Sequence, residues 1–435
     1  MKSPDTSLRY RISQMLAHTD LLRSRVPVLR KAYLRGFRRS QLEAAHRLRD
    51  KERIEVAFFL TVPGMWKCDY LMQAMMANPR YHPYVVVYPY SQYKGFSHEE
   101  VEATLRRTVR FVEDKGYECV VPYDSRRRRW QDVKKTLNPD VVVFSDPYKD
   151  CLPRYFIHHF RDRLTCYVPY SLTILRLYRE NYGIMSINLM GLFCLETPMH
   201  RELALKYMPN GAVNAVVTGY PGTEVFLDPD YPPHDPWKPQ PVKKKRVIWA
   251  PHHSIDDDIS ISTFLLYCDD MLEVARRYSD RVQFAFKPHQ LLKFKLQRLW
   301  GAERTERYYN QWAELDNGQL EEASYVDLFL TSDAMVHDSA SFTTEYLYTR
   351  KPVMYLVRNS NQHDVLTPFG HLVFDAHYHG RVLADIEHFL DDTVLGGDDP
   401  KEGERKEVYD NYLGLVDGMR PSQRIIKELE NLINS

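Results

Sequence analysis

Cationic and polar side chains follow two strand-like runs in the second half of the chain. The run "RVIWA" leads into His252, His253 and Ser254, and the run "VQFAF" leads into Lys287 and His289. Imidazole, ammonium and hydroxyl groups are hydrogen-bond donors of the kind that a phosphate or pyrophosphate needs. A single histidine after a strand is more often structural. Two strands ending this way indicate an anion site, because the carboxyl ends of parallel strands meet at one edge of a sheet.

A third polar cluster lies in the loop "HDSASFT", which follows the apolar run "LFLTSDAMV" and precedes a helical stretch. Its polar members are His337, Asp338, Ser339, Ser341 and Thr343. The N-terminus of a helix presents N–H groups without intrahelical partners and carries a partial positive charge. The loop is therefore predicted to hold an anion together with the first two clusters.

The elements that must position these clusters alternate between strands and helices. Strands are expected at 54–62, 84–90, 119–123, 140–146, 163–170 and 214–222, and again at 246–253, 282–289, 328–336 and 352–357. Helices are expected within 63–81, 99–116 and 261–278. This βαβ rhythm predicts parallel sheets flanked by helices, with ligands at the carboxyl ends of the strands.

A proline-rich segment, residues 228–241, interrupts the rhythm and is predicted to be an interdomain linker. A chain of 435 residues with 44% hydrophobic content is long enough for two domains. We expect a basic segment at 1–50, an acceptor-side Rossmann-like domain at 51–230 and a nucleotide-donor domain at 231–435. The last helix could pack back on the first domain, and a cleft between the domains is the expected active site.

Composition narrows the class of protein. The six cysteines are scattered without metal-ligand spacing, which argues against a zinc site or a disulfide scaffold. No apolar run reaches the roughly 18 residues that span a bilayer, so a cytoplasmic protein is expected. Residues Asp256–Asp258 could bind a metal, but an acidic first turn of the following helix is the preferred interpretation. No cofactor is expected, although a divalent metal ion stays open.

The first 50 residues carry 12 Lys and Arg against 4 Asp and Glu. Apolar and basic residues alternate there at near-helical spacing, which suits a helix on an anionic membrane surface. A solvated helix covering the first domain, or a disordered arm, is the alternative. Nucleic acid is not an expected partner, because no binding motif accompanies the charge.

Several stretches resemble successive signatures of the CDP-glycerol glycerophosphotransferase family, which makes teichoic acid and capsule polymers. They are "VVTGYPGTEVF", "RVIWAPHHSI", "FKPHQ" and the stretch from "SYVDLF" to "KPVMYLV", in this order over roughly residues 190–360. The resemblance implies a GT-B architecture, in which two Rossmann-like domains face a central cleft. Together with the basic segment at 1–50, it leads us to expect a cytoplasmic enzyme that is peripheral on the inner face of the cell membrane. An acceptor hydroxyl, lipid-linked or on a polymer, would attack the β-phosphorus of CDP-glycerol or a related CDP-polyol and release CMP.

The resemblance also implies roles for single residues. His289 would contact the donor pyrophosphate, Ser341 would hold phosphate oxygens, and Glu345 would fit an acidic position for the cytidine ribose. Asp338 would shape its loop rather than touch phosphate, since like charges repel.

The sequence departs from the family pattern at several positions. Gln290 replaces a proline, Ala340 replaces a serine, and His252–His253 replace a threonine and an aromatic residue. The Trp-His-Gly turn, whose histidine is thought to be the acceptor base, is missing from "CYVPYSLTI". His158, His159 and Asp146 are the substitute candidates. A GT-B glycosyltransferase using a nucleotide sugar and a non-catalytic nucleotide-binding protein of the same fold are the alternative functions. Donor, acceptor, general base, primase or polymerase role, and oligomeric state stay open.

Overall fold

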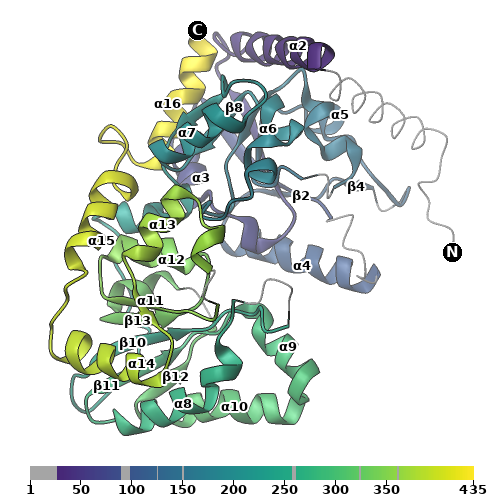
Figure 1. The fold of residues 1–435 in the computed structure, drawn as a ribbon. Coiled ribbons are helices and arrows are strands. Elements are labelled where there is room, and N and C mark those ends of the chain that lie inside the picture. Colours follow the sequence, from purple (N-terminus) through teal and green to yellow (C-terminus); the bar gives the residue numbers. More distant parts are fainter. Residues whose placement is uncertain are drawn as a thin grey trace. The chain divides into compact units, whose positions relative to one another are not determined.

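The computed structural model describes residues 27–89, 98–124, 126–148, 151–256, 261–322, 325–359 and 362–435. The chain forms two compact units (Figure 1). The first unit comprises the residues up to 171 together with 177–224 and 415–435, and the second unit comprises 172–176 and 225–414. None of the described helices combines the length and the hydropathy of a transmembrane segment.

The first unit is built on a seven-stranded parallel sheet with the strand order β3-β2-β1-β6-β7-β8-β9. The strands are β1 (Ile54–Leu60), β2 (Tyr81–Val87), β3 (Cys119–Val120), β6 (Val141–Phe144), β7 (Leu164–Tyr167), β8 (Leu192–Leu195) and β9 (Ala215–Val217). A short antiparallel pair, β4 (Tyr123–Asp124) and β5 (Arg129–Trp130), lies outside it. The central strands of the seven-stranded sheet are apolar on both faces, as expected for a parallel sheet covered by helices on both sides.

Helices cover both faces of this sheet. They are α2 (Pro27–His46), α3 (Asp69–Met76), α4 (His98–Asp114), α5 (Val133–Thr136), α6 (Met185–Leu189), α7 (Pro198–Tyr207) and α16 (Pro421–Asn434). Alternate residues of β1 point to opposite faces: Phe58 joins the core that includes residues of α16, and Phe59 joins the core that includes residues of α2. The C-terminal helix α16 contacts α2 and α3, so the end of the chain packs on its own first unit.

Helix α2 is the part of the basic N-terminal segment that the structure describes, since residues 1–26 lie outside the described ranges. Its apolar side chains Leu34 and Phe37 are buried in the first unit. Lys31, Arg35 and Arg39 are exposed. The helix therefore covers the first unit with its apolar face and turns a basic face to solvent.

The second unit has a six-stranded parallel sheet with the order β12-β11-β10-β13-β14-β15. The strands are β10 (Lys245–Ala250), β11 (Val282–Phe286), β12 (Gly318–Leu320), β13 (Ala334–His337), β14 (Val353–Leu356) and β15 (Tyr378–Gly380). The helices are α8 (Phe264–Arg277), α9 (Gln290–Trp300), α10 (Ala302–Glu314), α11 (Val326–Thr331), α12 (Phe342–Glu345), α13 (Pro368–Asp375), α14 (Leu383–His388) and α15 (Glu402–Val408).

Short 3-10 and π turns complete both units. They are η1 (Pro63–Met65), η2 (Pro153–Tyr155), η3 (Ile157–Phe160), η4 (Arg179–Gly183), η5 (Pro221–Leu227), η6 (Tyr346–Thr349), η7 (Gln362–Val365), η8 (Phe389–Leu395) and η9 (Tyr409–Leu413). The proline-rich segment 228–241 lies in the second unit, where Trp237 is buried and its indole N–H donates to Thr331 Oγ1 at 3.0 Å.

Two expectations about local structure are wrong. The apolar run at 328–336 is not one strand: its first half belongs to α11, and only Ala334–His337 forms β13. A short apolar run fits a buried helix as well as a strand, so periodicity could not separate the two. Asp256 does not lie in the first turn of α8, which begins at Phe264 and has no acidic residue in its first turn. Asp257 and Asp258 fall outside the described residues.

Candidate functional site

The site of the second unit lies where three adjacent strands end. β11, β10 and β13 are neighbours in the sheet, with Trp249 opposite Phe286 and Ala250 opposite His337. Because the strands are parallel and in register, their following loops start at one edge. This edge carries the three clusters that the sequence singled out.

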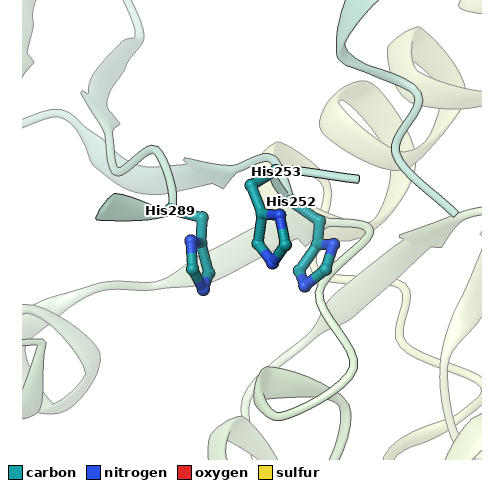
Figure 2. Close-up of side chains that lie close together, drawn as sticks. All are labelled: His252, His253 and His289. Carbon is teal, nitrogen blue, oxygen red and sulfur yellow. The ribbon is translucent and has the colours of Figure 1, made fainter. Parts of the chain in front are cut away.

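Three imidazoles gather at this edge, two from the loop after β10 and one from the loop after β11 (Figure 2). Ring centroids are 4.2 Å apart for His252 and His253, 4.3 Å for His253 and His289, and 5.2 Å for His252 and His289. One ring nitrogen from each residue lies within 4.8 Å of the others. The structure thus brings together three of the predicted donor-binding residues, which we call the histidine cluster.

The strand-end histidines share one local geometry. The backbone N–H of Ser254 donates to His252 Nδ1 at 3.2 Å, and that of Leu291 donates to His289 Nδ1 at 3.1 Å. After β13, the N–H of Ser339 donates to His337 Nδ1 at 3.1 Å. In each case the donor is two residues beyond the histidine. A neutral imidazole that accepts at Nδ1 carries its proton on Nε2, so each ring is assigned as an Nε2–H donor.

Burial keeps these rings neutral. Burial, the largest cause, and the charges of neighbouring imidazoles and lysines together lower the pKa of His252 to about 3 and that of His289 to about 4. Burial also lowers the pKa of His337 to about 3. At neutral pH, His252 and His289 therefore offer N–H groups without a positive charge. An arriving anion would favour the charged form, so its binding should raise both pKa values.

Asp338 ties two of the loops together. Its carboxylate accepts the backbone N–H of His252, the backbone N–H of Thr263 at 2.5 Å and the Thr263 hydroxyl at 2.9 Å. The side chain is buried, and burial raises its pKa to about 6. Its oxygens, in the loop after β13, are thus engaged by donors of the segment between β10 and α8, which is the geometry expected of a residue that shapes the site.

His337 and His377 are completely buried with their ring centroids 5.3 Å apart. His377 Nδ1 lies 2.6 Å from the Val373 carbonyl and must donate to it, which leaves His377 Nε2 as an acceptor. His337 Nε2 and His377 Nε2 have no protein hydrogen-bond partner. The His337 ring therefore faces the interior of the second unit.

The other predicted donor-binding residues vary in accessibility. Ser341 is exposed, and its hydroxyl lies 3.4 Å from that of Ser339. The Thr343 hydroxyl donates to the Ser339 carbonyl at 2.8 Å. Ser254, Lys287 and Glu345 are buried. Burial lowers the pKa of Lys287, and the carboxylates of Glu321 and Glu322 oppose that shift.

The cluster could also hold a metal ion, since imidazole is a common ligand. A metal would need the lone pair of Nε2, whereas His252 and His289 carry a proton there in the hydrogen-bond network of the structure. The Asp256 carboxylate lies 2.7 Å from Lys295 Nζ and is not among the residues whose ligand atoms meet in the cluster. In this tautomer His252 and His289 each offer an N–H donor at Nε2.

The corresponding edge of the first unit carries carboxylates. Asp146 follows β6 and Glu196 follows β8, on either side of β7. Asp146 accepts the N–H of Tyr148 at 2.8 Å. Burial raises the pKa of Tyr167 at the end of β7, and the charges of Glu196 and Asp146 add to the shift, so both carboxylates lie near this phenol. Glu196 is buried with its Oε2 at 3.9 Å from His200 Nδ1.

His158 and His159 lie in η3, which leads into the amino end of β7. The His158 ring stacks on Tyr33 of α2 at 6.4 Å. His159 Nε2 lies 2.8 Å from Asp132, which caps α5. Neither residue follows the carboxyl end of a strand, whereas Asp146 does.

Sequence reasoning missed His377, Thr263 and Glu196. The sequence did carry a signal for the contact between a histidine Nδ1 and the N–H two residues later, because the pattern His-x-Ser recurs at 252–254 and 337–339. Thr263 and His377 lie far along the chain from the residues that they face, so no local pattern connects them.

Comparisons with known proteins agree with the sequence resemblance. A profile of the family described as CDP-Glycerol:Poly(glycerophosphate) glycerophosphotransferase matches residues 202–431, more than half of the chain. A search of curated protein sequences finds no match.

Several solved structures are similar in fold. A variant of the wall teichoic acid polymerase TagF shares 14% identity over 96% of this chain and 97% of its own, with a TM-score of 0.54. MnaA of S. aureus, solved with UDP, shares 16% identity over 88% of this chain and 98% of its own, with a TM-score of 0.55. The UDP-GlcNAc 2-epimerase of Neisseria meningitidis, bound to UDP-GlcNAc, shares 13% identity over 87% of this chain and 100% of its own, with a TM-score of 0.55.

At these identities the structural likenesses establish the fold alone, and they confirm the expected α/β class of GT-B type. The profile match covers the second sheet, the histidine cluster and the loop after β13. The chain therefore belongs to the CDP-glycerol:poly(glycerophosphate) glycerophosphotransferase family of transferases.

Proposed function

We propose that the protein transfers glycerol phosphate, or a related polyol phosphate, from a CDP-activated donor to an acceptor hydroxyl in teichoic acid or capsule synthesis. The observation that carries this proposal is the pair of neutral Nε2–H groups at His252 and His289, whose Nδ1 atoms are occupied by backbone N–H groups. Such donors suit phosphate oxygens. Family membership supports the cytidine donor.

The chemistry assigned to the second unit is stabilisation of negative charge. When the acceptor oxygen bonds to the β-phosphorus, the bond from that phosphorus to the bridging oxygen of CMP breaks, and charge develops on the leaving phosphate. Groups that bind this charge more strongly in the transition state than in the ground state accelerate the reaction. His289 and His252 can do so by hydrogen bonding, and His252, whose Nδ1 lies 2.9 Å from the Ser254 hydroxyl, can also take up a proton as its pKa rises.

The exposed Ser341 hydroxyl is a further donor that we assign to phosphate oxygens. Glu345 keeps its proposed role toward the cytidine ribose, although it is buried in the structure. For the general base we favour Asp146 over His158 and His159. It is partly exposed and follows the carboxyl end of β6, where ligands of parallel sheets bind.

Peripheral membrane contact on the cytoplasmic face is part of the proposal. The basic face of α2 supports an electrostatic interaction, since its apolar face is buried in the first unit. Binding of the full chain to anionic liposomes should fall steeply as salt is added. Substituting Arg35 and Arg39 by Gln should weaken it by about 1 kcal/mol per residue, while exposed Glu43→Gln should not. Binding that ignores salt would contradict this contact.

The donor is tested by thermal shift with CDP-glycerol, CDP-ribitol, CMP, a UDP-sugar and a GDP-sugar in EDTA. Cytidine compounds should stabilise the protein preferentially, and isothermal titration in two buffers of different ionisation enthalpy should show proton uptake on binding. A response confined to uridine or guanosine compounds would favour the glycosyltransferase alternative. Binding without CMP release in the presence of acceptor would favour the non-catalytic alternative.

A further inference from the structure

The histidine cluster has a second chemical capability. Among the residues that the structure describes, it is the one group of three or more His, Cys, Asp or Glu side chains whose ligand atoms meet at metal-binding distance, within 4.8 Å of one another. Figure 2 shows the three rings side by side, each reaching in the same direction from its loop. All three are partly buried, so their positions are set by the protein.

We propose that His252, His253 and His289 bind a transition-metal ion of the Zn²⁺ type, and that this ion excludes the donor phosphate from the same rings. Imidazole nitrogens select Zn²⁺, Cu²⁺, Ni²⁺ or Co²⁺, whereas Mg²⁺ and Ca²⁺ prefer oxygen ligands. A zinc–nitrogen bond of about 2.0–2.1 Å requires tetrahedral nitrogens roughly 3.4 Å apart. The ligand atoms lie within 4.8 Å of one another, so each pair must approach by about 1.4 Å at most.

Metal binding requires a change of tautomer. His252 and His289 must each move their proton from Nε2 to Nδ1, so that the Nε2 lone pair can coordinate. His252 has an acceptor ready for the Nδ1 proton, because Ser254 Oγ lies 2.9 Å from that nitrogen. Metal-bound histidines commonly donate their other N–H to such a partner. Both Nδ1 atoms also face a backbone N–H, at 3.2 Å for His252 and at 3.1 Å for His289. Among the described residues, a hydroxyl lies beside Nδ1 of His252 and none beside that of His289, so His289 is expected to be the weaker ligand of the two.

The same tautomer change makes the two occupants exclusive. Phosphate needs Nε2–H as a donor, and the metal needs Nε2 without its proton. One nitrogen cannot serve both, so the ion and the donor must compete. This second half of the inference rests on the proposed function, whereas binding of the ion does not.

Binding is tested with the full chain carrying no polyhistidine tag, by titrating Zn²⁺ against a chromophoric chelator. One Zn²⁺ per chain should bind at the cluster. His253→Ala and His252→Ala should each weaken it by tenfold or more, and His289→Ala by less. Mg²⁺ should not compete. His371→Ala is the matched control, because His371 and His363 stack at 4.0 Å without a third imidazole. Equal affinity in wild type and the three cluster variants would overturn the site.

Exclusion is tested by measuring CDP-glycerol binding in EDTA and at saturating Zn²⁺. The affinity should fall by at least tenfold in Zn²⁺ for wild type. An unchanged or higher affinity would show that the ion and the donor share the site, which would overturn exclusion. If no cytidine compound binds in EDTA, the proposed donor is wrong, and the Zn²⁺ titration still decides the metal site by itself.

Discussion

The two sheets place different chemistry at equivalent edges. In the second unit the strand ends carry neutral imidazole donors at His252 and His289, whereas in the first unit they carry the carboxylates of Asp146 and Glu196. One edge suits negatively charged phosphate, and the other suits a hydroxyl that must lose a proton. Two parallel sheets of the same architecture can thus present side chains of opposite electrostatic character. The residues at the strand ends differ, whereas the strands of both sheets are apolar.

The largest expected effect falls on the carboxylate edge. Asp146→Asn should lower CMP release by about 10²–10⁴-fold, the usual contribution of a general base, and should leave donor binding in the thermal-shift assay unchanged. His159→Gln should retain most activity, since His159 is bonded to Asp132. If activity were lost only in His159→Gln, the general base would lie in η3. The carboxylates at the first sheet edge would then have no part in the reaction.

The imidazole edge is tested at His289, which both faces the site and caps α9. His289→Ala should lower CMP release by about a hundredfold, the scale of one lost charge-stabilising donor. It should also cost about 1 kcal/mol of stability through the lost cap. His289→Asn should lose the same activity and keep most of the stability, because Asn is a good N-cap. Full activity in both variants would remove His289 from the reaction.

Asp338 is expected to act on stability. Asp338→Ala leaves the N–H groups of His252 and Thr263 without their acceptor, at about 1–3 kcal/mol for each buried group. The melting temperature should fall by several degrees, and Asp338→Asn, which retains one acceptor oxygen, should fall less. Loss of CMP release at unchanged melting temperature would instead assign Asp338 to the chemistry.

The last prediction is a pH dependence of stability from His337. Its pKa is about 3 in the folded protein and near 6.5 when unfolded. Between these values the unfolded state binds more protons, so stability should fall as pH drops from about 6.5 toward 3. His337→Asn can still accept the Ser339 N–H and should show a weaker decline over this range in urea titrations. Parallel curves for both proteins would contradict a buried neutral imidazole.

Much of the fold could be predicted from the sequence because its signals are local. The valine-rich and phenylalanine-rich runs at β1, β6 and β11 are strands, and the amphipathic run at 99–116 is α4. Strands β8, β12 and β15 were missed. The prediction of one strand at 328–336 was wrong because its apolar residues belong first to helix α11 and then to strand β13.

The site was predicted in part. The sequence pointed to His252, His253 and His289 as donors at neighbouring strand ends, and the structure brings them together. It could not show that the His337 ring turns inward to His377, because the two are forty residues apart and their contact depends on packing. The tautomers of His252, His289 and His337 follow from the backbone N–H group two residues beyond each of them. The position of these N–H groups is seen only in the three-dimensional structure.

The capping role of His289 gives the protein an internal reporter. One nitrogen of the ring is engaged by the first turn of α9, and the other is left for the ligand. In a ¹⁵N-histidine spectrum Nδ1 should therefore respond to fraying of the helix and Nε2 to arrival of phosphate, whereas a metal should change both, because the ring proton then moves from Nε2 to Nδ1. A phosphate should leave Nε2 protonated, and a metal should remove its attached hydrogen, so a single residue can tell an observer which occupant is present.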